Sequence, residues 1–588
     1  MRHAFHKNLT VSQNTCKTYL CSLLLLARVY RQQADSGAPD GPFLGNLERL
    51  IRSMHIHLGF ADLAVIACYF ILVLGVGFFL KGKMKTSADF LLSKRNFSHW
   101  VTGIAFMSAN LGALEVMGHV ANGAKYGMRT NHWYWVGAIP AMLFLGLFMM
   151  RFYYTNGIRS VPEYLRMRYD HRAHLLNAVS FAIVTVLMAG VDMFAFAVIF
   201  RSMLNWPFAV SVLLASSVVL LFVFWGGLTS SIYNEFLQFF LIVFGFLPLT
   251  FLGLRAVGGW HHLLTLLPSG YIHTWAGMGA PGDPLGVPWW VMALGNGLCA
   301  APAYWCTDFL LVQRAMAARD LDSARKTPLV AALPKMFFPV IVTVQGMIAL
   351  VIAPQIVSHN YNLALPVMMS RFYGQGMLGL GITALLASFM SGMAGNITAF
   401  NTVFTYDIYQ TYLVKHKPDH HYLVAGKVAT VSATALACLS SFIVLYFNNL
   451  MDYMALISIL FISPFFMIFL LGMLWKRPSA TAGFFGMVGG LCSAGSEYLL
   501  YRVGLLHFAS PMAANIWAAV WGLAGGLMVM IPLTFLTKSP EPASLKGLVF
   551  DLGETAIKES RKQPWYRTPA AFAIVVVLVF IVLNYVFF

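Results

Sequence analysis

The stretch MSANLGALEVMGHV, from Met107 to Val120, lies inside a long apolar run and still carries an amide and a carboxylate, Asn110 and Glu115. Glycines, which are poor helix formers, stand on both sides of the carboxylate. A charged side chain at the bilayer centre costs about 2.5–3.5 kcal/mol on insertion scales. Unwound backbone is tolerated at membrane depth only where it lines a cavity. The stretch therefore predicts a broken transmembrane helix beside a polar cavity.

The composition around this stretch is that of an integral membrane protein. Of the 588 residues, 59% are hydrophobic and 10% are charged, with a mean hydropathy of +0.70, whereas soluble proteins carry about 25% charged residues. The apolar runs are continuous, which predicts an all-α fold and not a barrel of short alternating strands. Fourteen candidate spans lie near residues 58–80, 100–126, 132–155, 174–203, 207–225, 231–255, 287–314, 327–354, 376–410, 423–446, 450–475, 480–503, 512–536 and 568–588.

The net charge of +17 reflects topology and does not indicate a nucleic-acid surface. When residue 58 is placed outside, most lysines and arginines fall in inner loops such as 81–99 and 537–567. By the positive-inside rule the first span enters from outside and the C-terminus lies outside. The loops are short and show no large outer domain, which favours a plasma membrane, the inner membrane of a bacterium, as the location.

A second interrupted helix is expected in the seventh span, which contains Gly295, Gly297 and Pro302. It lies five spans after the first interruption, and such pairs indicate inverted repeats around a site at the membrane midplane. The alternative is that these residues are merely common in membrane helices. Residues 1–57 fit neither repeat and are interpreted as an extension that is disordered or precedes the true start. The predicted division of the remaining chain is a first span with a basic loop, a first repeat, an outer loop, a second repeat and three final spans, at 58–99, 100–255, 256–286, 287–475 and 476–588.

Few charged residues lie deep in the spans, namely Glu115, Asp192, Glu235, Asp308 and Lys335. Placing each of them in the membrane carries a free-energy cost, so each is either part of a helix-locking ion pair or functional. Glu115 is expected to be protonated, or paired with Lys335 or a cationic ligand, because a dry site disfavours an isolated charge.

The ninth span carries hydroxyls at helical spacing, including Ser388 and Ser391. Such oxygens, together with carbonyls freed where a helix unwinds, suit Na⁺. The alternative is that the hydroxyls bond back to the preceding helical turn. No HExxH motif, Ser-His-Asp order or glycine-rich phosphate loop is present, and the seven cysteines show no metal or disulfide spacing. An enzyme and a bound cofactor are therefore not predicted.

Several motifs, in order, resemble those of the solute:sodium symporter family, in its sodium/glucose cotransporter-like branch. They are MSANLGALEVMG, GGLTSSIYNEFLQ, AYWCTDFLLVQRAMAARD, LASFMSGMAGN with TVFTYDIY, and FLLGMLWKRPSATAG, while DMFAFAVIF is a weaker match. The resemblance covers about residues 58–535. It implies a LeuT-type fold, with spans 2–6 and 7–11 as inverted five-helix repeats and extra helices outside.

The resemblance also implies a sodium site. Carried over by position, it uses carbonyls of Ser108, Leu111 and Ser388 and hydroxyls at two adjacent positions, which here are Ser391 and Gly392. One hydroxyl is therefore missing. Glu235, within YNE, stands for the acid of the family's YTD and is assigned to the sodium path.

The implied solute site departs further from the sugar transporters. Asn110, Tyr304, Trp305 and Lys335 match that branch, whereas Glu115 replaces Gln or His, Tyr134 replaces Glu, Ala301 replaces a polar residue and Leu456 replaces Gln. Lost hydrogen-bond partners change which solutes a buried site accepts. The predicted solute-binding residues are Asn110, Glu115, Tyr134, Ala301, Tyr304, Trp305, Asp308, Lys335 and Leu456.

The predicted function is sodium-coupled symport of a small polar solute by alternating access, with a sugar as the family-level expectation. The alternatives are a proton-coupled symporter acting through Glu115 and a symporter for an organic acid, an amine or another non-sugar. A membrane-embedded sensor without transport is the alternative from another class, although no appended signalling domain is visible. The expected partners are Na⁺, the solute and the lipid bilayer, with neither nucleic acid nor an obligatory protein partner.

Overall fold

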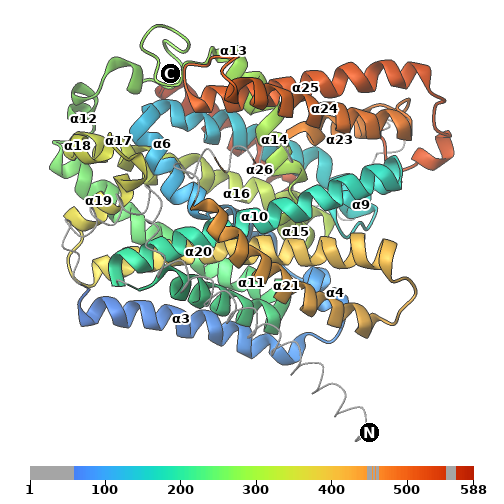
Figure 1. Ribbon diagram of the computed structural model, residues 1–588, viewed down its shortest axis with the longest axis horizontal. Coiled ribbons are helices and arrows are strands. Elements are labelled where there is room, and N and C mark those ends of the chain that lie inside the picture. The colour runs from blue at the N-terminus through green and yellow to red at the C-terminus, as the bar shows by residue number, and fades with distance from the viewer. Residues whose placement is uncertain (1–57, 205, 446–452, 454–456, 458–462, 551–563) are drawn as a thin grey trace, which may run out of the picture.

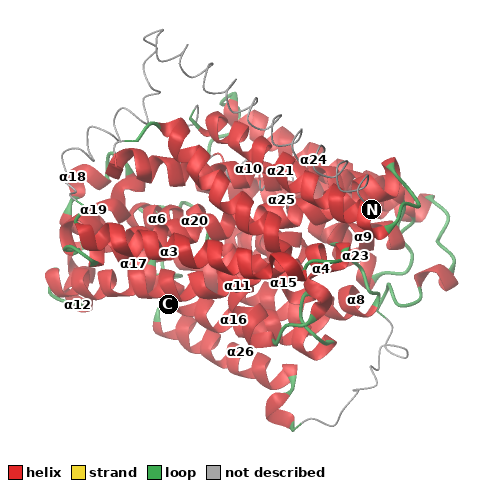
Figure 2. Ribbon diagram, turned by 90° about the horizontal axis from the view of Figure 1, so that it is seen from below, coloured by secondary structure: helices red, strands yellow, loops and turns green. Residues whose placement is uncertain are grey.

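The described part of the protein is a bundle of helices. The computed structural model describes residues 58–588 except 205, 446–452, 454–456, 458–462 and 551–563, so the predicted extension 1–57 and Leu456 lie outside the described residues. Within the described residues no strand forms, and an isolated β-bridge joins Phe97 to Ala318. Figures 1 and 2 show the helices packed side by side, with α3 along one face of the bundle and α24 and α25 at another.

The first half of the chain supplies the helices up to the large outer loop. They are α3 (Phe60–Leu80), α4 (Ser87–Leu92), α5 (His99–Asn110), η3 (Leu114–Gly118), α6 (His119–Tyr126), η4 (Gly127–Trp133), η5 (Tyr134–Ala138), α7 (Ile139–Phe144), η6 (Leu145–Met149), α8 (Met150–Thr155), α9 (Val161–Arg168), α10 (His171–Leu204) and α11 (Phe208–Ala256). Of these, η3, η5 and η6 are π-helical turns, a local form that is frequent at functional sites.

The second half begins in the outer loop and ends with three helices outside the repeats. Its helices are α12 (Trp260–Leu266), α13 (Trp289–Val291), the π-helix η8 (Met292–Ala300), α14 (Ala301–Thr307), α15 (Phe309–Met316), α16 (Leu321–Ile341), α17 (Thr343–Ile352), α18 (Pro354–Val357), α19 (Ala364–Phe372), α20 (Met377–Thr402), the π-helix η10 (Val403–Leu413), α21 (Asp419–Val444), α23 (Phe466–Leu474), α24 (Ala480–Arg502), α25 (Pro511–Leu536) and α26 (Pro569–Val586).

The all-α membrane fold predicted from the apolar runs is confirmed. Among the described residues, nine helical stretches are long and apolar enough to cross a membrane. Two of them, 114–155 and 208–256, each cover two predicted spans. The predicted seventh span is divided by a break, the eleventh is described only in part, and α24, the twelfth, carries glycines, serines and Glu497 that lower its hydropathy.

The fifth and sixth predicted spans are continuous helix except at one residue. Within α11, Gly227 has φ 53° and ψ −145°, and this point separates the two spans. A side chain at Gly227 would collide with the backbone carbonyl of Phe90 in α4. Glycine is therefore required there, both for the left-handed φ and for the close approach of α4.

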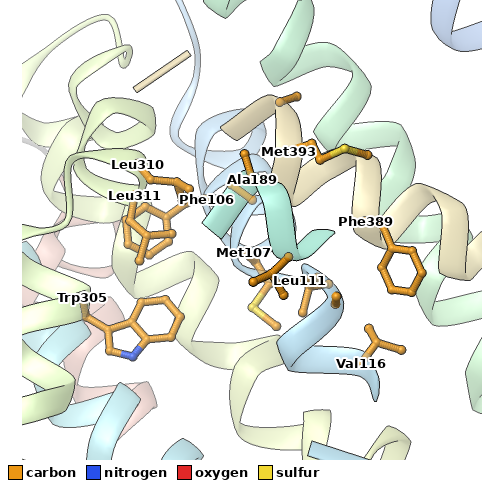
Figure 3. Close-up of a cluster of buried hydrophobic side chains, with 14 of the residues drawn as sticks. Phe106, Met107, Leu111, Val116, Ala189, Trp305, Leu310, Leu311, Phe389 and Met393 are labelled. Atoms are coloured by element: carbon orange, nitrogen blue, oxygen red, sulfur yellow. The ribbon is translucent and has the colours of Figure 1, made fainter. Parts of the chain in front are cut away.

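Among the nine described stretches, the one that contains α20 is the most buried. Of the residues in its apolar segment, 89% lie inside the protein, compared with 28% for α3 and 22% for α26. Side chains from α5, α10, α15 and α20 pack together around the first helix break, as Figure 3 shows for Phe106, Leu111, Ala189, Leu310 and Phe389. α3 and α26 face outward. Because α20 is enclosed by other helices, its polar residues are screened from lipid.

The outer loop is clamped from two directions. Arg129 in η4 is 1% exposed and donates hydrogen bonds to Asp283 and to the carbonyls of His273, Thr274 and Ala276. From the other side, the backbone N–H groups of residues 274–276 donate to the carbonyls of residues 587 and 588, at the far end of α26. The side chain of Trp275 also donates to Asn584, at 2.9 Å. Residues 587 and 588 and the loop around Trp275 therefore form one cap.

Candidate functional site

The first helix break lies where the sequence predicts it. α5 ends at Asn110, Leu111 has the non-helical angles φ −80° and ψ 44°, and helical structure resumes at Leu114. The N–H of Leu111 donates to the carbonyl of Ser108 at 2.8 Å, and the N–H of Ala113 donates to the carboxylate of Asp192 in α10 at 2.8 Å. The break thus leaves carbonyl oxygens outside the normal helical pattern, as a cation site requires.

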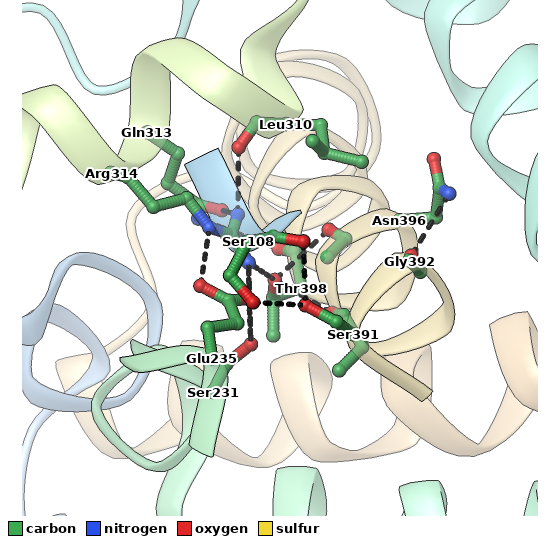
Figure 4. A network of polar contacts seen from close by, with 12 residues as sticks. Ser108, Ser231, Glu235, Leu310, Gln313, Arg314, Ser391, Gly392, Asn396 and Thr398 are labelled. Atoms are coloured by element: carbon green, nitrogen blue, oxygen red, sulfur yellow. Dashed lines mark hydrogen bonds and ion pairs between the residues drawn. The ribbon is translucent and has the colours of Figure 1, made fainter. Parts of the chain in front are cut away.

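Hydroxyls of α20 face these carbonyls. The Ser391 hydroxyl donates to the carbonyl of Ser108 at 2.9 Å and lies 3.2 Å from the Ser108 hydroxyl. The Ser388 hydroxyl donates to the carbonyl of Leu111. Figure 4 shows Ser108 and Ser391 pointing toward each other. The structure therefore gathers three of the five predicted sodium ligands, the carbonyls of Ser108 and Leu111 and the hydroxyl of Ser391, and adds the hydroxyl of Ser388, whose carbonyl was the predicted ligand. These oxygens are of the kind that a hard cation binds.

Position 392, where the resemblance implies a hydroxyl, has no room for a side chain. A Cβ at Gly392 would lie 2.9 Å from Cγ of Asp192 and still closer to one carboxylate oxygen. The space of the missing side chain is filled by a carboxylate, so a serine does not fit there without displacing Asp192. The sequence flagged Asp192 as a buried acid, but its approach to Gly392 spans about 200 positions of the chain and no local signal reveals it.

A cavity of about 230 Å³ adjoins the break. Its walls include every described residue of the predicted solute site, namely Asn110, Glu115, Tyr134, Ala301, Tyr304, Trp305, Asp308 and Lys335. The cavity is smaller than the roughly 300–1,000 Å³ of pockets for drug-sized ligands. It therefore suits a small solute.

Lys335 of α16 lies at the centre of a buried polar network. Its ammonium group is 2.5 Å from Glu115 Oε1 and 2.6 Å from Asn110 Oδ1, and the Asn110 amide donates to the Tyr304 hydroxyl at 3.0 Å. The rings of Tyr134 and Trp305 lie 4.6 Å and 5.2 Å from the same ammonium group. The carboxylate, the amide oxygen and the aromatic faces together compensate a lysine that is 2% exposed.

The second helix break is not at the glycines. The predicted seventh span stays helical through Gly295 and Gly297, as the π-helix η8, and Pro302 lies in the first turn of α14, where proline is tolerated. The chain breaks at Asp308, with φ −71° and ψ 114°. The Asp308 carboxylate accepts the N–H of Leu310 at 2.8 Å and so caps α15. The expected position of this interruption was therefore wrong by several residues.

Glu235, predicted on the sodium path, forms a buried ion pair with Arg314 of α15. Its carboxylate also accepts the Ser231 hydroxyl at 2.6 Å, and Arg314 reaches the Thr398 hydroxyl of α20 at 3.3 Å. Figure 4 shows this pair beside Ser108 and Ser391. The pair joins α11, α15 and α20 next to the oxygen cluster, which is compatible with a locking role as well as with the predicted one.

Some cavity residues have no counterpart in the predicted site. Asn296, Asn396 and Asn515 add amides, and Met512 and Ile516 add apolar surface from α25, which lies outside the predicted repeats. Asn515 is a lone amide in an apolar run, and that is the one signal from which its place could have been inferred.

Several known proteins are similar to this chain in sequence or in fold. The model of the sodium:solute symporter family matches residues 90–490. A sodium/glucose cotransporter of Vibrio parahaemolyticus is 24% identical over 84% of this chain and 93% of its own length. A sodium/myo-inositol cotransporter of Mus musculus is 27% identical over 86% of this chain and 77% of its own length. The solved structure of a Na⁺-coupled sialic acid symporter superposes with a TM-score of 0.69 and 19% identity, covering 82% of this chain and 99% of that one.

Proposed function

The chain belongs to the sodium:solute symporter family, and we propose that it uses the first helix break to couple Na⁺ to a small polyhydroxylated solute. It is a multi-pass membrane protein and a sodium-coupled symporter, not an enzyme. Residues 100–255 and 287–475 are the inverted repeats of this proposal, and in alternating access a four-helix bundle rocks against the rest of the protein.

One observation carries the coupling proposal, namely that the break serves both sites. Its backbone presents the carbonyls of Ser108 and Leu111 to α20, while its side chains Asn110 and Glu115 face the cavity. In the sodium site, Ser388 and Ser391 turn their hydroxyl protons away and offer oxygen to the ion. An ion that fixes this short segment also fixes the solute-binding side chains, which lowers the entropic cost of binding the solute.

The solute proposal rests on the balance of donors and acceptors. Glu115 and Lys335 compensate each other, so the network offers alternating hydrogen-bond donors and acceptors without net charge. Hydroxyl groups can both donate and accept, and the Trp305 ring supplies an apolar face. A sugar or a cyclic polyol fits this chemistry and the cavity volume of about 230 Å³. Relatives named for glucose and for myo-inositol add support.

A cationic solute is the second candidate, and a count of charges favours it. The cavity walls carry three carboxylates, from Glu115, Asp192 and Asp308, against one lysine. One Na⁺ leaves an excess of negative charge that a quaternary ammonium group could neutralise over the aromatic rings.

Uptake into proteoliposomes tests both candidates. Labelled glucose, labelled myo-inositol and labelled choline are offered with an inward Na⁺ gradient, and K⁺ replaces Na⁺ in the control. Sodium-driven uptake of a polyol supports the proposal. Uptake of choline without either polyol replaces it with the second candidate.

The proposed sodium site is tested by Ser391→Ala, which removes a hydroxyl that faces the Ser108 carbonyl. The sodium concentration for half-maximal uptake should rise about tenfold, the equivalent of about 1.4 kcal/mol. The matched control is Ser441→Ala in α21, a buried serine whose hydroxyl donates to the Cys438 carbonyl of its own helix at 2.7 Å. Equal sodium dependence in the two variants would place the coupling ion elsewhere.

The proposed orientation has residue 58 and the C-terminus outside, in the inner membrane of a bacterium. It rests on the basic inner loops and the short outer ones.

A further inference from the structure

Asp192 carries a buried carboxylate without a cationic partner. It lies in α10, is 6% exposed, and accepts a hydrogen bond from the Ala113 N–H at 2.8 Å. No lysine, arginine or histidine in the described part of the chain forms an ion pair with it, although Glu115 and Glu235 each have one. A buried charge is costly unless it is paired or binds a metal ion. The missing partner is therefore expected to be a mobile cation.

Two glycines make room for this carboxylate. A Cβ at Gly112 would lie 2.8 Å from Asp192 Oδ1, and a Cβ at Gly392 would lie closer still to Oδ2. Gly112 belongs to the helix break and Gly392 to α20. The carboxylate thus sits between the two elements that supply the proposed sodium ligands. Any side chain at either glycine would push it out.

The position of the carboxylate has a direct chemical meaning. Gly392 directly follows Ser391, and it stands where the resemblance to the family places the second hydroxyl of the sodium site. We propose that the Asp192 carboxylate is a charged ligand of the coupling Na⁺ and takes the place of the hydroxyl missing at position 392. The proposal rests on the sodium site proposed above. It changes the character of that site, because a ring of neutral oxygens becomes a ring with one negative charge.

A purely structural role makes a different prediction. If Asp192 only holds the backbone of the break through Ala113, then Asp192→Asn should be harmless, because an amide oxygen accepts the same hydrogen bond. If the charge binds the ion, Asp192→Asn should raise the sodium concentration for half-maximal effect at least about tenfold. The effect is measured as Na⁺-dependent thermal stabilisation of purified protein, with KCl as the reference, and as Na⁺-dependent uptake.

A pair of compensating changes tests the replacement itself. Gly392→Ser alone should weaken sodium binding because its Cβ displaces the carboxylate. Asp192→Ala alone should weaken it by removing the ligand and opening the space. The double variant Asp192→Ala with Gly392→Ser rebuilds a hydroxyl site and should return the half-maximal sodium concentration to within about threefold of the native value. Two harmful changes that repair each other would be hard to explain without a shared ligand position.

Controls separate this inference from the sodium site itself. Asp62→Asn removes another buried carboxylate, one that accepts the N–H groups of Gly376 and Gly379 far from the cavity, and should leave the sodium concentration unchanged. If Ser391→Ala weakens sodium binding but Asp192→Asn does not, Asp192 is a backbone brace and the inference is overturned while the site stands. If neither variant changes sodium binding, the proposed site falls as well. A double variant no better than Asp192→Ala overturns the replacement.

Discussion

Replacing Glu115 by Gln isolates the energetic role of the pair it forms with Lys335. The two side chains are 4% and 2% exposed, and the ion-pair distance is 2.5 Å. The variant keeps the shape and an acceptor oxygen but leaves the lysine without its counter-charge.

The expected cost follows from the surroundings of Lys335. Removing one partner of a buried ion pair costs about 3–5 kcal/mol. Here the ammonium group keeps the Asn110 oxygen at 2.6 Å and two ring faces within 5.2 Å, and a desolvated cation–π contact contributes about 2 kcal/mol. The net loss should therefore be about 1–3 kcal/mol. Solute affinity should also change at least about tenfold, because Glu115 faces the cavity.

The decisive comparison is with Lys335→Met and with the double variant. When both charges are gone, neither remains buried without a partner, so the double variant should be more stable than Glu115→Gln alone. Thermal unfolding in detergent gives the order of stabilities, and equilibrium binding of the transported solute gives the affinities. If Glu115→Gln unfolds at the same temperature as the native protein and binds the same solute equally well, the pair has no energetic role and Glu115 does not contact the solute.

Three further perturbations follow from the fold. Gly227→Ala should cost at least about 1–3 kcal/mol because of its positive φ and the approach of Phe90, and this cost should appear as a lower melting temperature. Gly82→Ala is the control and should leave the melting temperature unchanged, because a methyl group there meets nothing within 4 Å. Equal losses in the two variants would refute the argument. In α9, burial raises the pKa of Glu163, but the neighbouring Arg159 and Arg166 outweigh burial and hold that pKa below its ordinary value. The stabilisation is therefore present above the ordinary carboxyl pKa and lost as the pH falls through the lowered value. The melting temperature of the native protein should exceed that of Glu163→Gln at pH 7, and the difference should vanish below about pH 4. A difference that persists in acid would contradict the lowered pKa of Glu163. Residues 90 and 270 should lie inside and outside, respectively. Because the side chain of Phe90 is buried, the test uses single cysteines at the nearby exposed positions 83 and 269, which should react with an impermeant reagent only from inside and only from outside; the reverse pattern would invert the proposed topology.

The sequence predicts the first break well because the signal is local. An amide, a carboxylate and glycines in an apolar run leave few alternatives at membrane depth, and the structure breaks at Leu111. The second break illustrates the limit of the same reasoning. Gly295 serves close packing against Ile516 of α25, and the interruption falls at Asp308, whose side chain caps the next helix. Glycine alone does not separate a packing role from a break.

The residues of the site fall into two similar groups, those indicated by local sequence and those placed by packing between helices. Residues on the quoted motifs, such as Asn110 and Tyr304, reach the cavity as expected. Two other placements depend on contacts between helices that are remote in the chain, namely the packing of Asp192 against Gly392 and the entry of Asn515 into the cavity from α25. Their positions are set by packing, and a single sequence carries no record of which helices meet.

The cap formed by residues 587 and 588 and the loop around Trp275 has a consequence for how the protein is made. Trp275 and its partner Asn584 are 309 positions apart, so at about 5–20 residues per second the ribosome needs roughly 15–60 s to connect them. During that interval Arg129 can hold only one side of the loop around Trp275. The cap closes when α26 has inserted and residues 587 and 588 reach the loop. Completion of this cap therefore reports that α26 is in place, and an accessible Trp275 would mark a molecule in which α26 has not yet docked.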